Sequence, residues 1–318
     1  MRLIFALLMA VAASTVVAQT YPTRPIRVIV PQPPGGGFDL VARVLAEPLA
    51  RVMGNPVVVE NRPGGGTIVG TEAVAKAEPD GYSILLGANA NIVFNNGLYD
   101  RLPYDPKADF VPVGIATFNS YTLVARNDLP FKSLKEIVEF ARANPGKLTY
   151  ASAGNGTGQH IAAAVTFHRA GVQITHVPYK GAGPAYQDLM PGRVDLFFDN
   201  AATAQPHIDG GRVKAIAVST PERYPALPDV LTVRENGVDF DLEAWIGYFV
   251  RAGTPEPIVA RLRADFDKVL AMPDIAAGLQ KRGYRPVRLA PREAEALVTR
   301  DIDKWTQLIR SAGIRVAD

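Results

Sequence analysis

The sequence predicts an α/β protein built from two lobes in succession, followed by a helical tail. Short apolar runs alternate with helical patterns over residues 26–88, and the alternation restarts near residue 133. Three glycine-rich stretches, 31–40, 61–67 and 152–158, each follow a predicted strand and precede a predicted helix. Such alternation is typical of parallel sheets flanked by helices, and a cleft between two lobes is a common ligand site.

The first unit reads as β-α-β-α-β. The strands are predicted at 26–30, 56–60 and 82–88, and the helices near 38–53 and 67–77. Val41, Val44, Leu45 and Leu49 recur at helical spacing and mark the buried side of the first helix.

The second unit begins with a helix that Ser133 and Glu136 open as a capping box. Strands are predicted at 148–152, 173–179, 193–198 and 213–219, and helices at 158–171 and 183–190. A further strand at 243–250 leads into a helix that Thr254 caps, with Pro255 in its first turn, and into a last helix near 291–312. We assign residues 19–121 and 243–318 to lobe 1 and residues 122–242 to lobe 2.

The N-terminus predicts export. Arg2 precedes an apolar run at 3–13, and Val16 and Ala18 fit the small-residue rule for cleavage after Ala18. The apolar stretch of residues 3–18 is shorter than the roughly 20 residues that span a bilayer. Residues 1–18 are therefore expected to be a signal peptide, and the mature protein is expected in the periplasm.

Composition excludes several classes of function. The chain of 318 residues carries a formal net charge of +3, and its basic residues form no run, so nucleic-acid binding is not expected. It contains no cysteine, which rules out disulfides, thiolate catalysis and cysteine-based metal sites.

The glycine-rich stretch 31–40 predicts an anion site. Gly35, Gly36 and Gly37 allow unusual backbone angles and expose N–H groups next to a helix start, where the helix dipole is positive. Plain turn geometry would explain one such loop, but three of them favour a ligand. The phosphate-loop pattern is absent, and Gln159 replaces the third glycine of a dinucleotide fingerprint, so no phosphate cofactor is expected.

No catalytic set is evident from the sequence. Ser152 lacks the first glycine of a nucleophile elbow, and the histidines, at 160, 168, 176 and 207, lack metal-binding spacing. We therefore expect no catalytic residues and no bound metal.

Several polar and aromatic residues near the predicted loops have two interpretations. Asp39 would cap the helix or receive an amine, and Phe38 would cover the ligand or fill the core. Lys180 would counter an anion or be solvated, and His160 would touch a ligand or cap a helix. Asp199 and Asn200 end a strand on the cleft side or cap a loop.

The motifs "ENRPGGG", "PDGY" and "VPYKG", in this order, resemble the Bug family of extracytoplasmic solute receptors of tripartite tricarboxylate transporters. The resemblance runs from about Tyr21 to Val316. It implies a two-lobed type II periplasmic binding protein fold, whose loops hold a small carboxylate by backbone N–H groups and ordered water. It also implies a pair of membrane transporter subunits as partners.

Carried over by motif, the resemblance implies a set of ligand-binding residues. In the first lobe they are Gly35, Gly36, Gly37, Phe38 and Asp39; in the second they are Ser152, Gly154, Asn155, Gly156, Thr157 and His160, flanked by Tyr179, Lys180, Gly181, Asp199 and Asn200. Family members often carry Ser or Thr near the position of Phe38, so a less polar pocket is expected here.

The expected function is a monomeric receptor without catalysis or cofactor. Two alternatives remain: a receptor that presents its ligand to a sensor protein, and a periplasmic α/β hydrolase using Ser152 with His160.

Overall fold

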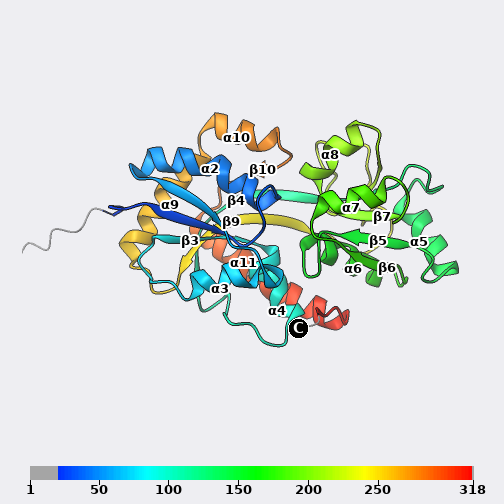
Figure 1. Cartoon of the computed structure of the whole chain (residues 1–318), viewed down its shortest axis with the longest axis horizontal. Coiled ribbons are helices and arrows are strands. Elements are labelled where there is room, and N and C mark those ends of the chain that lie inside the picture. Colours follow the sequence, from blue (N-terminus) through cyan, green and yellow to red (C-terminus); the bar gives the residue numbers. More distant parts are fainter. Residues whose placement is uncertain (1–20, 317–318) are drawn as a thin grey trace, which may run out of the picture.

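The computed structural model describes residues 21–316, in which two α/β lobes lie side by side (Figure 1). This architecture agrees with the fold that the sequence predicts. The predicted signal peptide lies outside the described residues. No helix in the described part of the chain is long and apolar enough to cross a membrane.

Lobe 1 is built on a mixed sheet with the strand order β2-β1-β3-β9-β4. The strands β1 (Ile26–Val30), β2 (Val57–Asn61) and β3 (Ser83–Ala88) are parallel, as their apolar runs predict. The strand β9 (Glu243–Arg251) joins antiparallel to β3, and the short β10 (Arg285–Pro286) pairs with β4 (Phe110–Ala125). The parallel strands end at the side of the sheet that faces lobe 2 (Figure 1).

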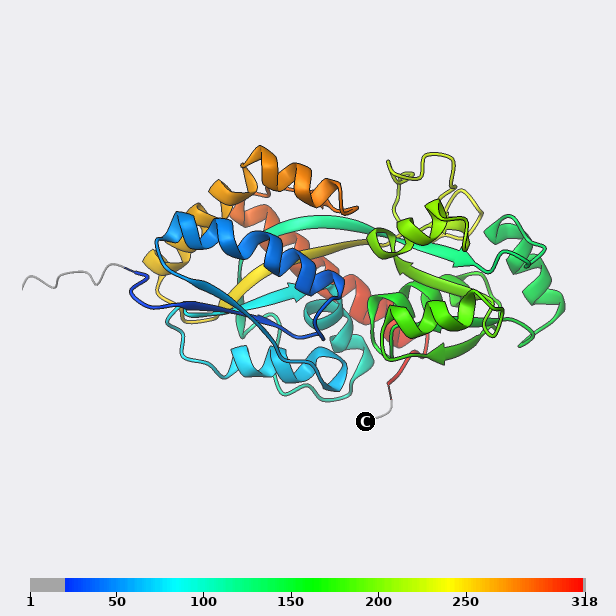
Figure 2. The same ribbon diagram turned by 45° about the horizontal axis from the view of Figure 1, so that its top comes forward.

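Helices cover both faces of this sheet (Figure 2). The helices α2 (Gly37–Met53), α9 (Glu256–Leu270) and α10 (Pro273–Gln280) share an apolar core with Val28 of β1. The helices α3 (Ile68–Ala75), α4 (Asn95–Leu98) and α11 (Pro291–Ser311), and the π-helix η2 (Asn89–Phe94), pack on the other face with Ile29. Alternate residues of β1 therefore serve two cores.

Lobe 2 repeats the pattern on a smaller scale. Its strands are β5 (Thr149–Ser152), β6 (Thr175–Pro178), β7 (Leu196–Asn200) and β8 (Lys214–Val218). Its helices are α5 (Leu134–Ala143), α6 (Gly158–Arg169), α7 (Ala182–Leu189) and α8 (Ala201–Asp209). Of the predicted capping box, the Ser133 side chain accepts a hydrogen bond from the Glu136 N–H, but the Glu136 carboxylate accepts from the Lys132 N–H rather than from that of Ser133.

The strand β4 connects the lobes, and the sequence analysis missed it. It pairs with β9 from Phe110 to Ser120, then with β7 from Tyr121 and with β8 from Thr122. Its residues are buried along almost the whole length, so no alternation marks it as a strand. Pro112, Gly114 and Asn119, residues typical of turns, further hide the pattern.

Two smaller predictions were incomplete or wrong. The helix α8 was not predicted; Asn200 caps it by accepting a hydrogen bond from the Ala202 N–H. Thr254 does not cap α9. The cap residue is Pro255, and the Thr254 hydroxyl donates to the Arg251 carbonyl instead.

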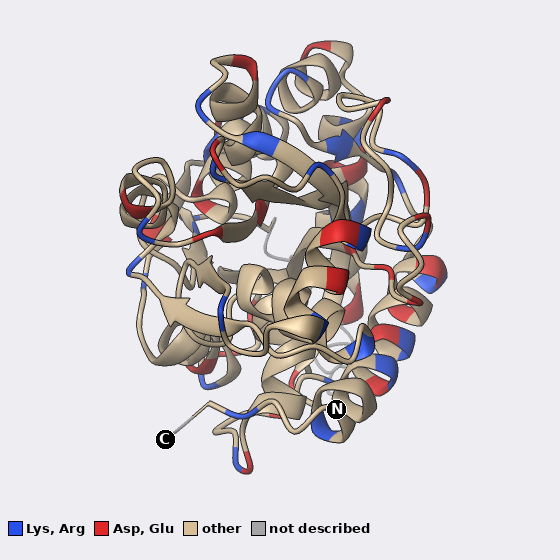
Figure 3. Cartoon of the chain, turned by 90° about the vertical axis from the view of Figure 1, so that its right-hand side faces the viewer, with Lys and Arg blue, Asp and Glu red and all other residues tan. Residues whose placement is uncertain are grey.

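Positions of Lys and Arg alternate with positions of Asp and Glu along the ribbon in the view of Figure 3.

Candidate ligand site between the lobes

The first glycine loop places free backbone donors at the edge of lobe 1. The helix α2 begins at Gly37, and its first hydrogen bond runs from the Leu40 N–H to the Gly36 carbonyl. No side chain caps this end. The N–H groups of the first turn therefore have no partner within the helix, and they lie at the positive end of its dipole.

Asp39 holds this loop in place. Its carboxylate accepts hydrogen bonds from the Gly35 N–H at 3.0 Å, Asn61 Nδ2 at 3.0 Å and Arg43 Nε at 2.9 Å. Burial alone would raise the pKa of Asp39, but these hydrogen bonds outweigh it and hold the pKa below its ordinary value. Asp39 is thus an ionised anchor of the loop, and all these partners belong to lobe 1.

The side chain of Phe38 is half-buried. It packs at the margin of the core formed by α2, α9 and β1. The structure therefore favours the core-filling interpretation of this residue.

Polar side chains form hydrogen bonds with the second glycine loop, residues 152–158, and hold it in position. Ser152 Oγ accepts a hydrogen bond from the Gly154 N–H at 3.2 Å. Thr157 Oγ1 donates to the Gly154 carbonyl at 2.7 Å and accepts from the His160 N–H at the start of α6. His160 Nδ1 accepts the Gly156 N–H at 3.2 Å, so His160 supports the loop from a buried position.

The segment 179–181 also forms hydrogen bonds with the second glycine loop. The N–H groups of Tyr179 and Gly181 donate to the carbonyls of Ser152 and Ala153 at 3.0 and 3.1 Å. The Tyr179 hydroxyl donates to Asp188 on α7. Lys180 is exposed, and so is Asn155 at the tip of the second loop.

Asp199 is fully buried at the end of β7. Burial raises the pKa of its carboxyl group, although hydrogen bonds from Thr203, the Asn200 N–H and Gln159 oppose the shift. With these partners, Asp199 fixes the start of α8 and the first turn of α6. Asn200 then lies at the lobe boundary.

The two lobes meet at glycines. A methyl group at Gly37 would lie 2.5 Å from Tyr284 Oη and 3.7 Å from Asn200 Nδ2 of lobe 2. A methyl group at Gly66, in the stretch 61–67, would lie 2.5 Å from Tyr99 Oη and 3.9 Å from the Asn155 carbonyl of lobe 2. The atoms of lobe 2 lie at ordinary van der Waals distance, and the close contacts that require glycine at both positions come from Tyr284 and Tyr99 of lobe 1.

The hydrolase hypothesis paired Ser152 with His160, but the structure pairs Ser152 with His176 instead. Ser152 Oγ lies 2.7 Å from His176 Nε2, whereas His160 bonds to the loop backbone. The two imidazoles stack at 4.1 Å, and Tyr150 stacks on His176 at 4.8 Å. No carboxylate among the described residues is bonded to His176, so the third member of a triad is lacking.

Burial lowers the pKa of His160 to about 3, with a contribution from neighbouring His176, and lowers the pKa of His176 to about 4. Both rings are therefore neutral in the fold near pH 7. The unfolded chain takes up protons once the pH falls below about 6.5, so stability should decline from there towards pH 4.

We expect the free energy of unfolding to fall on acidification by up to about 1.4 kcal/mol per pH unit for His160, and by less for the partly exposed His176. Denaturant unfolding at pH 7, 6 and 5 measures this slope. The variant H160Q should flatten it, and H168Q, at an exposed position of α6, should leave it unchanged. An equal slope in H160Q would contradict the assignment.

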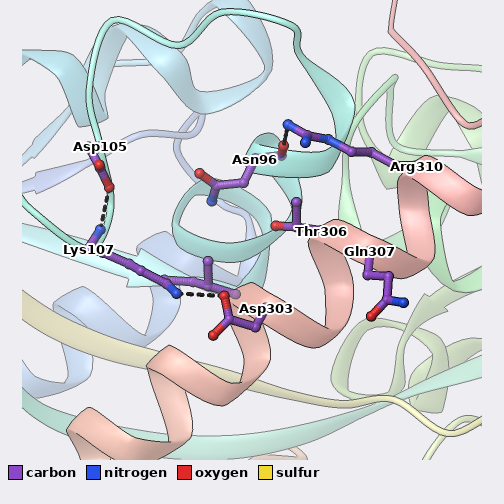
Figure 4. Close-up of a pocket in the computed structure, with 8 residues that line it drawn as sticks. Asn96, Asp105, Lys107, Asp303, Thr306, Gln307 and Arg310 are labelled. Carbon is purple, nitrogen blue, oxygen red and sulfur yellow. Dashed lines mark hydrogen bonds and ion pairs between the residues drawn. The ribbon is translucent and has the colours of Figure 1, made fainter.

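A separate hollow of about 550 Å³ lies between α4 and α11 on the outside of lobe 1 (Figure 4). Its charged side chains already have partners: Lys107 pairs with Asp303, and Arg310 donates to the Asn96 carbonyl. It has none of the free backbone donors found between the lobes. Within residues 21–316 no group of three or more histidine or acidic side chains could hold a metal ion.

The sequence analysis missed two tyrosines, Tyr121 and Tyr284, that lie at the boundary between the lobes. Tyr121 lies at the point where β4 changes partners, and a methyl group at Gly158 would lie 1.8 Å from its Oη. Tyr284 comes from the turn between α10 and β10. Neither stands in a motif, and only the fold brings them to the glycine loops.

Comparisons with known proteins agree with this arrangement. Residues 41–314 match the family model of the tripartite tricarboxylate transporter family receptor. Among solved structures, the chain is 31% identical to Rpa4515 of R. palustris with adipate, at a TM-score of 0.86, covering 93% of this chain and 100% of that one.

The periplasmic binding protein BugD is 36% identical at a TM-score of 0.84, covering 93% of this chain and 100% of BugD. MatC from Rhodopseudomonas palustris with bound malate is 35% identical at a TM-score of 0.84, covering 91% and 100%. The two-lobed binding-protein fold predicted from the sequence is thereby confirmed.

Proposed function

The chain belongs to the family of tripartite tricarboxylate transporter receptors, which confirms the resemblance to Bug receptors, and we propose that it captures a small organic carboxylate between its lobes for delivery to a membrane transporter. Solved relatives carry adipate and malate, which supports a carboxylate as the ligand. The family is one of solute-binding receptors rather than enzymes.

The observation that carries the proposal is that both glycine loops have a residue at the lobe boundary: Gly37 lies near Asn200 of lobe 2, and Gly158 lies against Tyr121 of the connecting strand β4. The helices α2 and α6 both start there, at Gly37 and Gly158. Their first-turn N–H groups are charge-complementary to a carboxylate without any cationic side chain. Closure would exclude water, and the backbone donors would replace the hydration of the anion.

Under this proposal most of the predicted site residues fall into two groups. The glycines and Asn200 lie at the boundary and are placed to face the ligand. Asp39, His160 and Asp199 hold the loops in position by hydrogen bonds.

A thermal-shift screen of the mature protein, with co-purified ligand removed by unfolding and refolding, tests the proposal. A ligand at about 100 times its dissociation constant adds roughly 2.7 kcal/mol of stability. We expect a shift with one class of carboxylic acid and none with its amide. A flat response to dicarboxylates, tricarboxylates, aromatic acids and amino acids, from well-folded protein, would contradict it.

The cellular setting belongs to the same proposal. We place the mature receptor in the periplasm as a monomer, with signal cleavage after Ala18. We place the lobes at 19–121 with 243–318 and at 122–242; the change of β4 partners between Ser120 and Tyr121 supports the first boundary. If the receptor serves a sensor protein instead, a sensor kinase gene rather than a transporter pair should lie beside its own.

The close contact of Ser152 with His176 makes a hydrolase the second candidate. We expect no turnover of ester substrates by the parent protein. We further expect S152A to bend the second loop and weaken carboxylate binding, because Ser152 Oγ accepts the Gly154 N–H. Ester hydrolysis by the parent that disappears in both S152A and H176Q would instead establish the enzyme.

A further inference from the structure

A cavity of about 730 Å³ lies between the lobes beside the connecting strand β4. We call it the hinge pocket. Lobe 2 contributes the loop 220–226, and lobe 1 contributes the turn 280–285. Its lining includes Phe118, Asn119, Glu222, Tyr224, Glu243 and Tyr284.

Two buried polar side chains of the hinge pocket lack partners. Asn119 is 3% exposed and Tyr284 is 2% exposed. Neither Asn119 Oδ1 nor Tyr284 Oη has a hydrogen-bond partner among the described residues. An unpaired buried polar atom costs roughly 1–3 kcal/mol. Both atoms are therefore available to a bound molecule.

The hinge pocket also offers free hydrogen-bond acceptors. Its two guanidinium groups are paired, Arg285 with Glu243 and Arg223 with Glu235. Glu222 has no ion-pair partner among the described residues, and Asn119 Oδ1 adds a second free acceptor. Phe118, Tyr224 and Tyr284 supply apolar ring surface between these groups. Such a pocket suits an apolar body that ends in a hydrogen-bond donor.

Tyr284 connects the hinge pocket to the first glycine loop. Its ring lines the pocket, and its hydroxyl lies against Gly37 at the start of α2. On β4, Asn119 and Tyr121 are two residues apart and thus point to the same side, and Tyr121 lies against Gly158 at the start of α6. The pocket and the carboxylate site therefore share a wall.

We propose that the hinge pocket receives the far end of the captured ligand, so that the preferred ligand is a carboxylate with an apolar body ending in a hydroxyl or ammonium group. The inference rests on the proposed carboxylate capture. Tyr284 Oη donates to the carboxylate end, and Asn119 Oδ1 accepts from the terminal donor.

Titration calorimetry with straight-chain acids from butyrate to octanoate length, each with a terminal methyl, hydroxyl, ammonium or carboxylate group, tests this assignment. We expect one length at which the hydroxyl or ammonium acid binds about tenfold more tightly than the methyl acid. The variant N119L should remove this preference, and Y284F should weaken all acids by a similar factor.

Thr117 provides the matched control. It lies two residues before Asn119 on β4, its hydroxyl is buried and unpaired among the described residues, and it does not line the hinge pocket. The variant T117V should keep the terminal preference. If N119L does not fold, N119A serves in its place. If the parent protein prefers the ammonium acid to the hydroxyl acid and E222Q abolishes this preference, the terminal donor is an ammonium group.

Equal binding of methyl and donor-terminated acids at every length would overturn the inference while leaving carboxylate capture intact. A preference unchanged in N119L and N119A would also overturn it. Failure of all the acids, together with malate and adipate, would instead count against the proposed function itself.

Discussion

The substitution Gly158→Ala should destabilise the protein and weaken carboxylate binding at least tenfold. The added methyl group would lie 1.8 Å from Tyr121 Oη and 2.5 Å from its Cζ, so the ring would have to leave its position. Tyr121 is 8% exposed, and overpacking of this kind costs typically about 1–3 kcal/mol. Because Gly158 is the first residue of α6, the same displacement shifts the donors proposed to hold the ligand.

Gly183 is the matched control for this substitution. It also lies in the first turn of a helix, α7, and a methyl group there would meet no atom within 4 Å. Because Pro184 follows and disfavours a Cβ on a helical neighbour, we expect G183A to change stability by at most about 1 kcal/mol in either direction, well below the cost of G158A. Denaturant unfolding and titration calorimetry compare the two variants. Equal stability of G158A and G183A would mean that Tyr121 does not occupy this position.

Asp39→Asn should release the first glycine loop and reduce both stability and ligand affinity. The carboxylate receives three hydrogen bonds, including one from the Gly35 N–H, and is 4% exposed. An amide cannot accept all three, and a buried donor is left facing Asn61 or Arg43. Hydrogen bonds to charged groups contribute about 1.5–3 kcal/mol each, so we expect a loss of about 2 kcal/mol at pH 7.

The pH dependence of this loss follows from the lowered pKa of Asp39. Its contribution is present above the ordinary carboxyl pKa and is lost as the pH falls through the lower pKa of the folded state. The deficit of D39N relative to the parent should therefore shrink at strongly acidic pH. R43Q removes only the exposed partner and should cost less than D39N at pH 7. A greater loss in R43Q would show that the ion pair, rather than the loop anchor, matters most.

Much of the fold follows from local patterns. The strands β1, β2 and β5 are apolar runs followed by glycine and a helix, so periodicity and turn chemistry predict them together. The strand β4 has no such pattern, because two sheets bury it along almost its whole length. Its role depends on pairing with β9, which lies more than a hundred residues later.

The candidate ligand site could likewise be predicted only where its residues leave a local pattern in the sequence. Gly35–Gly37 and the stretch 152–158 stand out because backbone geometry leaves a local signature. Tyr121, Tyr284 and Asn119 leave none, since side chains that line a boundary between lobes need no particular neighbours in sequence. Asp39 was recognised, but its partners Gly35 and Asn61 show that it anchors the loop.

The central claim is that backbone N–H groups of the two glycine loops hold the carboxylate. Selective 15N-glycine labelling tests it directly, because the chain has only 28 glycines and each gives one amide signal. On addition of the acid found in the thermal-shift screen, the largest shifts should fall on Gly36, Gly37 and Gly158, because the N–H groups of Gly35, Gly154 and Gly156 already donate to Asp39, Ser152 and His160. Saturating binding that leaves these three signals in place and moves others would contradict the account.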